Sequence, residues 1–141
     1  EVYTIKEMYD ILSESDTKIN VFTYYEDVDW FSNFVMDLPV NGIGLDFVNG
    51  RKSYDRLLDL GKFPKDKTLF AGFVDGINVW KTDVKDTLRK VEELSSFVDN
   101  IVVTNAGPLF HLPVTLENEE NLPDYLYQSL SFATEKLRQY Q

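Results

Sequence analysis

LPVNGIGLDFVNG, residues 38–50, is the stretch of sequence that decides the fold. Its centre, residues 43–47, is a short β-rich run, and apolar residues at helical spacing follow it at Tyr54, Leu57 and Leu58. Gly61 comes next, in the position where a glycine commonly ends a helix. A strand that leads directly into a helix is the repeating unit of a parallel β-sheet.

The same unit occurs four times along the chain. The other β-rich runs are residues 19–24, 69–74 and 101–104, and successive runs begin roughly 25–30 positions apart, which accommodates a strand, a crossover helix and two short loops. Apolar residues three and four positions apart follow each run. They predict helices marked by Val28, Phe31, Phe34 and Leu38, by Val84, Leu88, Val91 and Leu94, and by Leu126, Leu130, Ala133 and Leu137, the last entered through Pro123. A leading helix is predicted by a capping box, Thr4 with Glu7, ahead of Ile5, Met8, Tyr9 and Leu12.

The predicted fold class is therefore α/β, with a leading helix and four consecutive βα units. A complete TIM (β/α)8 barrel takes about 250 residues, so residues 1–141 would form one partial barrel, about half of the whole. The competing topology is an open flavodoxin-like sheet. Such sheets usually carry a glycine-rich phosphate loop after the first strand, whereas the first run here ends Thr23-Tyr24-Tyr25-Glu26.

A half barrel leaves two strand edges unpaired and one face of its sheet without a cover. We expect the barrel-facing side chains, Val21, Leu45, Phe70 and Val102 or their neighbours, to be partly uncovered. The chain should then self-associate.

Composition narrows the classes of function. The chain is 43% hydrophobic and 14% aromatic, enough for a core, and 24 acidic against 14 basic residues give a net charge of -10. Nucleic acid and anionic membranes are therefore poor partners, because both are bound through clusters of lysine and arginine. There is no cysteine and no run of about 18 apolar residues, so we expect a soluble, cytoplasmic protein.

Three segments of the sequence carry a family resemblance. They are residues 38–50, LPVNGIGLDFVNG; residues 61–83, GKFPKDKTLFAGFVDGINVWKTD; and residues 109–114, LFHLPV, with Glu117-Asn118-Glu119 beyond. In order and spacing they resemble elements of the amino-terminal barrel of the cobalamin-independent methionine synthase family, whose members are 5-methyltetrahydropteroyltriglutamate-homocysteine methyltransferases. The resemblance covers about two thirds of the chain and implies that it is the later half of that barrel.

The resemblance also implies how such an enzyme would be organised. Two barrels face each other, the carboxy-terminal one holds zinc and homocysteine, and methyltetrahydrofolate with its polyglutamate tail binds between them. The zinc ligands belong to the other barrel, so this segment is expected to hold no metal or cofactor and to have no catalytic residue. Two positions depart from the family pattern: Ile77 stands where an arginine is usual, and Gly107 where a cysteine is usual.

Candidate substrate-binding residues lie where the β-rich runs end, since functional groups of a βα barrel project from the carboxyl ends of its strands. They are Asp46, Asp75, Asn78, Trp80 and His111, with Tyr24, Tyr25 and Asn105 at the same edge. Asp46 and Asp75 could serve as acid and base in glycoside hydrolysis or bind a hard cation, or they could cap loops by accepting backbone N–H groups.

Two of the candidates have a structural alternative of their own. Trp80 could stack on a pterin ring, although a tryptophan after a turn is more often core or interface. His111, the single histidine, is expected to be buried and hydrogen-bonded rather than a ligand or base.

Two functions remain open at this stage. The chain is either the non-catalytic scaffold portion of a methionine synthase, with the carboxy-terminal barrel as its partner and methyltetrahydrofolate and homocysteine as the substrates of the whole enzyme, or a stand-alone, divergent binding domain without methyltransferase activity.

Overall fold

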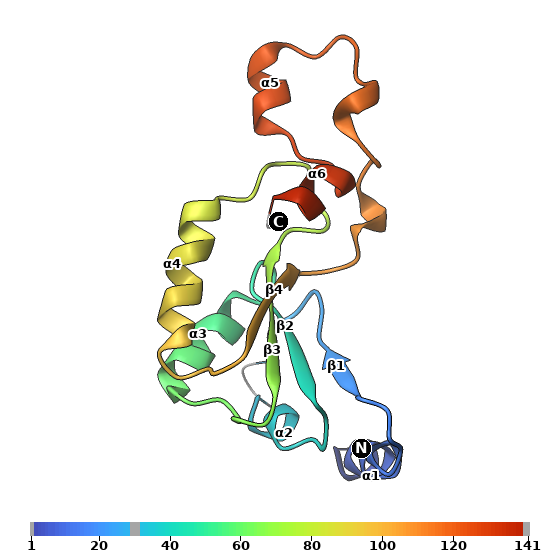
Figure 1. Cartoon of the computed structure of the whole chain (residues 1–141), viewed down its shortest axis with the longest axis vertical. Coiled ribbons are helices and arrows are strands. Elements are labelled where there is room, and N and C mark those ends of the chain that lie inside the picture. The colour runs from blue at the N-terminus through green and yellow to red at the C-terminus, as the bar shows by residue number, and fades with distance from the viewer. Residues whose placement is uncertain (1, 29–31, 140–141) are drawn as a thin grey trace.

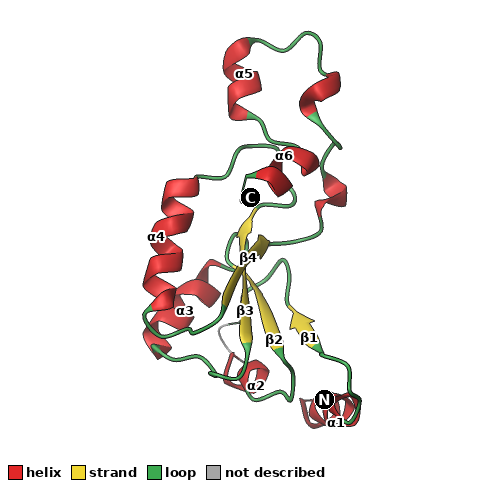
Figure 2. Cartoon of the chain, viewed as in Figure 1, coloured by secondary structure: helices red, strands yellow, loops and turns green. Residues whose placement is uncertain are grey.

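The fold is described from a computed structural model of the chain, which describes residues 2–28 and 32–139. Strands alternate with helices through the first two thirds of the chain, and short helical segments follow (Figures 1 and 2). The elements in order are α1 (Val2–Ser13), β1 (Asn20–Phe22), α2 (Ser32–Met36), β2 (Gly42–Asp46), α3 (Arg51–Leu60), β3 (Thr68–Val74), α4 (Val84–Ser95), β4 (Ile101–Asn105), the 3-10 turns η2 (Leu109–His111) and η3 (Leu116–Asn118), α5 (Asp124–Ser129) and α6 (Ala133–Arg138).

The four strands form one parallel sheet in the order β1-β2-β3-β4. Consecutive order without reversal is the strand order of a βα barrel, whereas a doubly wound flavodoxin-like sheet reverses direction at a switch point. The half-barrel prediction is confirmed, and the four β-rich runs match the four strands to within one or two residues at most ends.

The core lies between the sheet and the helices that follow β2 and β3. Ile43 and Leu45 of β2 and Leu69 of β3 are buried in one cluster with Leu57 of α3 and Leu94 of α4. Figure 1 shows α3 and α4 side by side on this face of the sheet. The expectation that Val21 and Leu45 face the barrel interior is wrong, because both pack in this helix-side cluster.

The opposite face of the sheet is the interior of the half barrel. The rings of Phe22 and Phe70 lie against Gly44 and Gly42, where a Cβ atom would meet them at 2.0 and 2.5 Å, and the two rings are 5.1 Å apart. Val102 stands beside Phe70 in the strand register. Phe22 and Val102 remain 40% and 45% exposed, so this face lacks a cover among the described residues.

Helix boundaries follow local signals in two cases and depart from them in two others. Gly61 ends α3 in the left-handed conformation (φ 56°), as predicted, and the Asp83 carboxylate caps α4 by accepting from two backbone N–H groups of its first turn. α1 begins at Val2, so Thr4 lies inside the helix and the predicted capping box is wrong. α2 is short, and Phe31 of its predicted stripe lies outside the described residues.

The single last helix that was predicted is in fact two. Between α5 and α6 the chain is extended: Leu130 pairs with Trp80 in an antiparallel bridge, Ser131 N donates to Val79 O (2.7 Å) and Lys81 N donates to Ser129 O (2.9 Å). Leu130 N still makes the helical bond to Leu126 O (2.9 Å), and the helical pattern ends at Ser131, whose N–H has the long-range partner instead. None of the helices in residues 2–28 and 32–139 is long and apolar enough to cross a membrane.

Candidate functional site

Asp46 is fixed at the carboxyl end of β2 by its own loops. The residue is 1% exposed, and its carboxylate accepts from Val48 N and Asn49 N on Oδ1 and from Asn49 Nδ2 and Tyr25 N on Oδ2, all at 2.8–2.9 Å. A buried carboxylate with four donors is fully satisfied. Asp46 therefore joins the loop after β1 to the loop after β2, as the loop-capping alternative predicted.

Tyr25 connects Asp46 to His111 across this edge of the sheet. Its backbone has φ 73°, the left-handed region that is uncommon for a residue other than glycine, and the bond to Asp46 holds it there. The Tyr25 hydroxyl is 3.3 Å from His111 Nε2, and the two rings meet edge to face. His111 is exposed, so the expectation of a buried histidine is wrong, although it does have a hydrogen-bonding partner.

Tyr24, next to this group, is partly buried. Burial, followed by the neighbouring Tyr25 hydroxyl and the Asp46 carboxylate, raises the pKa of Tyr24 above its ordinary value. A tyrosine hydroxyl is ordinarily protonated near neutral pH, and the raised pKa keeps that of Tyr24 so.

Asp75 and Asn78 shape the loop that follows β3. Asp75 Oδ1 accepts from Ile77 N (2.8 Å) and Asn78 N (3.0 Å), and Asn78 Oδ1 accepts from Trp80 N (2.9 Å). Such side-chain to backbone bonds two and three residues ahead are typical of Asx turns. Trp80 is 50% exposed, so the core role considered for it is not what the structure shows.

Asp75, Asn78 and Trp80 line one end of a cleft of about 730 Å³ between α3 and α4, on the helix side of the sheet. Tyr25, Asp46 and His111 are not among the residues that line it. The five candidates are thus divided between two places: Asp46 and His111 are joined through Tyr25, and the other three share the wall of the cleft.

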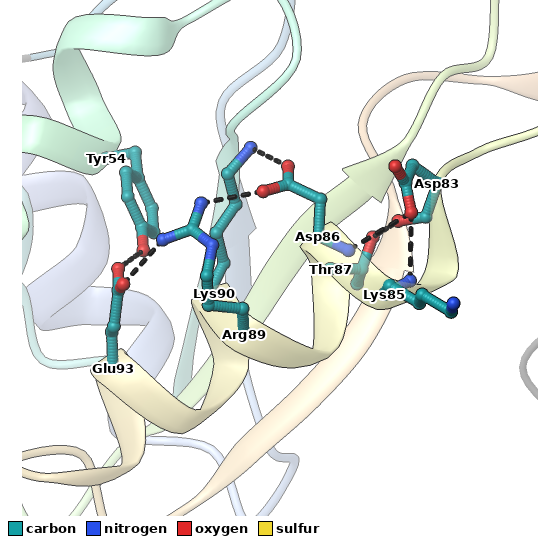
Figure 3. A network of polar contacts seen from close by, with 8 residues as sticks. All are labelled: Tyr54, Asp83, Lys85, Asp86, Thr87, Arg89, Lys90 and Glu93. Carbon is teal, nitrogen blue, oxygen red and sulfur yellow. Dashed lines mark hydrogen bonds and ion pairs between the residues drawn. The ribbon is translucent and has the colours of Figure 1, made fainter.

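A network of polar contacts forms another wall of the cleft (Figure 3). The Tyr54 hydroxyl on α3 donates to Glu93 on α4 (2.6 Å), Arg89 bridges Asp86 and Glu93, and Lys90 pairs with Asp86 (2.7 Å). Burial, and after it the bond to Glu93, raises the pKa of Tyr54 well above its ordinary value. Hydrogen bonds from Lys90 and Arg89 lower the pKa of Asp86. The charged side chains of the network pair with one another, and the bond from Tyr54 to Glu93 joins α3 to α4.

Sequence reasoning missed one buried charged residue near the carboxyl ends of β3 and β4. Lys136 on α6 is 1% exposed, and its Nζ donates to Trp80 O (2.9 Å). Burial lowers the pKa of Lys136, and the charge of Asp75 partly opposes this shift. Lys136 lies three positions after Ala133, beside the predicted apolar stripe, and that spacing was the available signal.

The residues present do not suit a zinc site. The chain has no cysteine and one histidine, and residues 2–28 and 32–139 contain no group of three His, Asp or Glu side chains placed to hold a metal ion. A catalytic zinc site needs three protein ligands, usually with histidine or cysteine among them.

The fold and the site together define a class: half of a (β/α)8 barrel whose carboxyl-edge carboxylates are bonded to their own loops. The chain belongs to the cobalamin-independent synthase family, within its N-terminal domain, which it matches over residues 1–99.

Relatives named 5-methyltetrahydropteroyltriglutamate–homocysteine methyltransferase match nearly the whole chain. The protein of Thermodesulfovibrio yellowstonii is 37% identical over 99% of this chain, that of Bacillus licheniformis 39% over 97%, and that of Thermotoga maritima 43% over 89%. The chain spans 19%, 18% and 16% of their respective lengths. It therefore corresponds to a minor part of each of these proteins.

Proposed function

We propose that the chain is a non-catalytic scaffold portion of a methyltransferase that moves a methyl group from 5-methyltetrahydrofolate, in its polyglutamate form, to homocysteine. The observation that carries this proposal is the colinear match, along 99% of the chain, to a relative named for that reaction. The zinc that activates the homocysteine thiol would belong to a carboxy-terminal barrel, and the whole enzyme would work in the cytoplasm.

The bonding of the carboxyl-edge residues supports the scaffold role. General acid–base catalysis needs a carboxylate that is free to take or give a proton within reach of a substrate. Asp46 accepts four hydrogen bonds and Asp75 two, all from residues of their own neighbouring loops. Their role is to shape the loops at the carboxyl edge, which in this proposal faces the second barrel.

A segment exchange tests the proposal. The segment of the Thermotoga maritima relative that aligns with this chain is replaced by the chain, and methionine formation is measured with folded, full-length protein. A scaffold should support activity within about tenfold of the parent, because the reacting groups lie elsewhere. A folded exchange protein without activity would show that the replaced segment supplies reacting groups that this chain lacks.

The isolated chain provides the complementary measurement. We expect it to form no methionine above a no-protein control, even with added zinc, and to retain no stoichiometric zinc after dialysis against a weak chelator. The unmodified Thermotoga maritima relative is the positive control. Methionine formation by the isolated chain would contradict the proposal.

A further inference from the structure

Lys136 is a buried cation without a carboxylate partner in the described part of the chain. None of the ion pairs within residues 2–28 and 32–139 includes it, and its Nζ donates to the neutral carbonyl of Trp80. The nearby Asp75 acts on it through charge and already accepts two backbone N–H groups. An ammonium group has three donors, and burying it without an anion is unfavourable.

Unsatisfied polar groups gather in the segments that Lys136 joins. Within the described residues, the buried side-chain atoms without a hydrogen-bond partner are Thr82 Oγ1, Ser131 Oγ and Gln139 Oε1. Hydrogen bonds from Ser131 N to Val79 O and from Lys136 Nζ to Trp80 O hold these segments together. Buried polar groups are normally bonded, so these atoms show that the packing of α6 against the sheet is incompletely satisfied, although none of the three residues lines the cavity described next.

A small cavity of about 140 Å³ adjoins Lys136 at the carboxyl ends of β3 and β4. Lys136, Thr104 and Asn105 give it polar groups, while the rest of its wall is aliphatic: Val74, Val103, Leu109 and Leu137. Strand carboxyl ends are where βα barrels bind ligands. A mainly apolar cavity with a few polar groups at one place is typical of a site for a small amphipathic molecule.

We propose that this cavity binds a small aliphatic carboxylate, with the carboxylate on the Lys136 ammonium and the short carbon chain against the aliphatic wall. The anion would neutralise the buried charge, and its oxygens could also accept from Asn105 Nδ2, whose other N–H bonds Gly107 O (2.7 Å). A doubly charged phosphate suits the cavity less well, because the wall is aliphatic and Asp75 is near. This site does not depend on the proposed methyltransferase role.

Propionate is the probe for the test. The chain, labelled with ¹⁵N, is titrated with sodium propionate at constant ionic strength, and amide shifts of Thr104 and Asn105 are followed; phosphate and chloride are titrated in parallel. Propionate should give saturable shifts at these residues. Absence of saturation, or phosphate saturating at a lower concentration than propionate, would overturn the proposal.

Two variants locate the binding. Lys136→Met keeps an unbranched side chain but removes the ammonium group, and it should weaken propionate binding by roughly tenfold or more, as expected for loss of a charge-assisted hydrogen bond. Lys85→Met, which removes an exposed lysine, is the matched control and should bind as the wild type does. If Lys136→Met does not fold, Asn105→Asp places a competing carboxylate in the cavity wall and should abolish saturation. Wild-type binding by a folded Lys136→Met or Asn105→Asp protein would contradict the assignment.

Discussion

At the scale of single residues, position could be predicted from the sequence but bonding could not. The rule that strands of a βα barrel present their polar groups at the carboxyl end located Asp46, Asp75 and His111. Whether a carboxylate there meets a substrate or its own loop depends on neighbours distant in sequence. For Asp46 the deciding neighbour is Tyr25, whose N–H reaches it from the loop after β1 in an unusual backbone conformation that no sequence pattern indicates.

Asp46→Asn should destabilise the fold strongly. An amide has one acceptor oxygen, so its NH2 group would face two of the four donors that now bond the carboxylate. Leaving buried donors unsatisfied costs about 2–4 kcal/mol in the free energy of unfolding. Urea unfolding followed by circular dichroism measures this loss, with the exposed Asp59→Asn as control. Equal midpoints for both variants would mean that the Asp46 bonds contribute no net stability.

Tyr54→Phe should change the titration of Glu93. The hydrogen bond from the Tyr54 hydroxyl is the main cause that lowers the pKa of Glu93, with Arg89 contributing after it. Without the hydroxyl the pKa of Glu93 should rise toward its ordinary value of 4.5. Carboxyl carbon shifts followed by NMR from pH 2 to 7 measure it, with the exposed Tyr127→Phe as control. An unchanged Glu93 titration would show that this bond is not maintained in solution.

At the scale of elements, the strands, α3 and α4 could be predicted from the local spacing of apolar residues, and the elements of the last third of the chain could not. The apolar spacing of Leu126, Leu130 and Ala133 predicts one helix, yet Leu130 belongs to a bridge with Trp80. Leu126 and Leu130 are still partly or fully buried, beside Leu116 and Phe132. The spacing thus reported the burial of Leu126 and Leu130 correctly, but not that of Leu137, which is 59% exposed. It did not report the backbone either, because the competing hydrogen bonds come from residues some fifty positions away.

Glu135 should make the attachment of α6 depend on pH. Its carboxylate accepts from Thr115 Oγ1, Leu116 N and Phe132 N, joining α6 to the start of η3. Burial alone would raise the pKa of Glu135, but these hydrogen bonds outweigh it and lower the pKa below 4.5. A carboxylate whose pKa is lower in the folded state than in the unfolded state stabilises the fold at pH values above its unfolded-state pKa. This stabilisation is lost as the pH falls through the folded-state pKa.

Glu135→Gln should therefore lower the free energy of unfolding by about 1 kcal/mol near neutral pH, as loss of a charged cap does. The loss should become progressively smaller below pH 4.5. Urea midpoints at several pH values between 2.5 and 7 measure the difference. Glu119→Gln, which alters an exposed carboxylate, is the control and should show no such trend. A difference that stays constant with pH would mean that the charge of Glu135 does not contribute.

At the scale of the whole molecule, the four consecutive βα units could be predicted because each unit is formed by neighbouring residues. Which side chains lie on the uncovered face of the sheet could not, because this depends on which residues of each strand point to that face. The sequence pattern places Gly44 inside the β-rich run of residues 43–47 and Gly42 directly before it. In the sheet they make room for Phe70 and Phe22, so the aromatic rings of the flanking strands cover β2 on the interior face. In this arrangement Phe22 lies on the exposed interior face and Val21 on the helix side, and the apolar pattern of the sequence does not indicate which of the two it is.

The last prediction follows from that exposed face. β1 and β4 each have one unpaired edge in the described sheet, and Phe22 and Val102 are 40% and 45% exposed between these edges. Unpaired parallel edges beside apolar side chains favour association, so the isolated chain should be a dimer or larger at micromolar concentration. Light scattering with size exclusion measures the mass.

Two variants locate the contact. Val102→Glu should shift the chain toward monomer, because a charge cannot be buried unpaired at the interface. Leu88→Glu, at a 57% exposed site on α4, should leave the mass unchanged. A wild-type monomer that also resists proteolysis would show that the interior face does not drive association, and an effect of Leu88→Glu equal to that of Val102→Glu would place the contact on the helical side of the sheet.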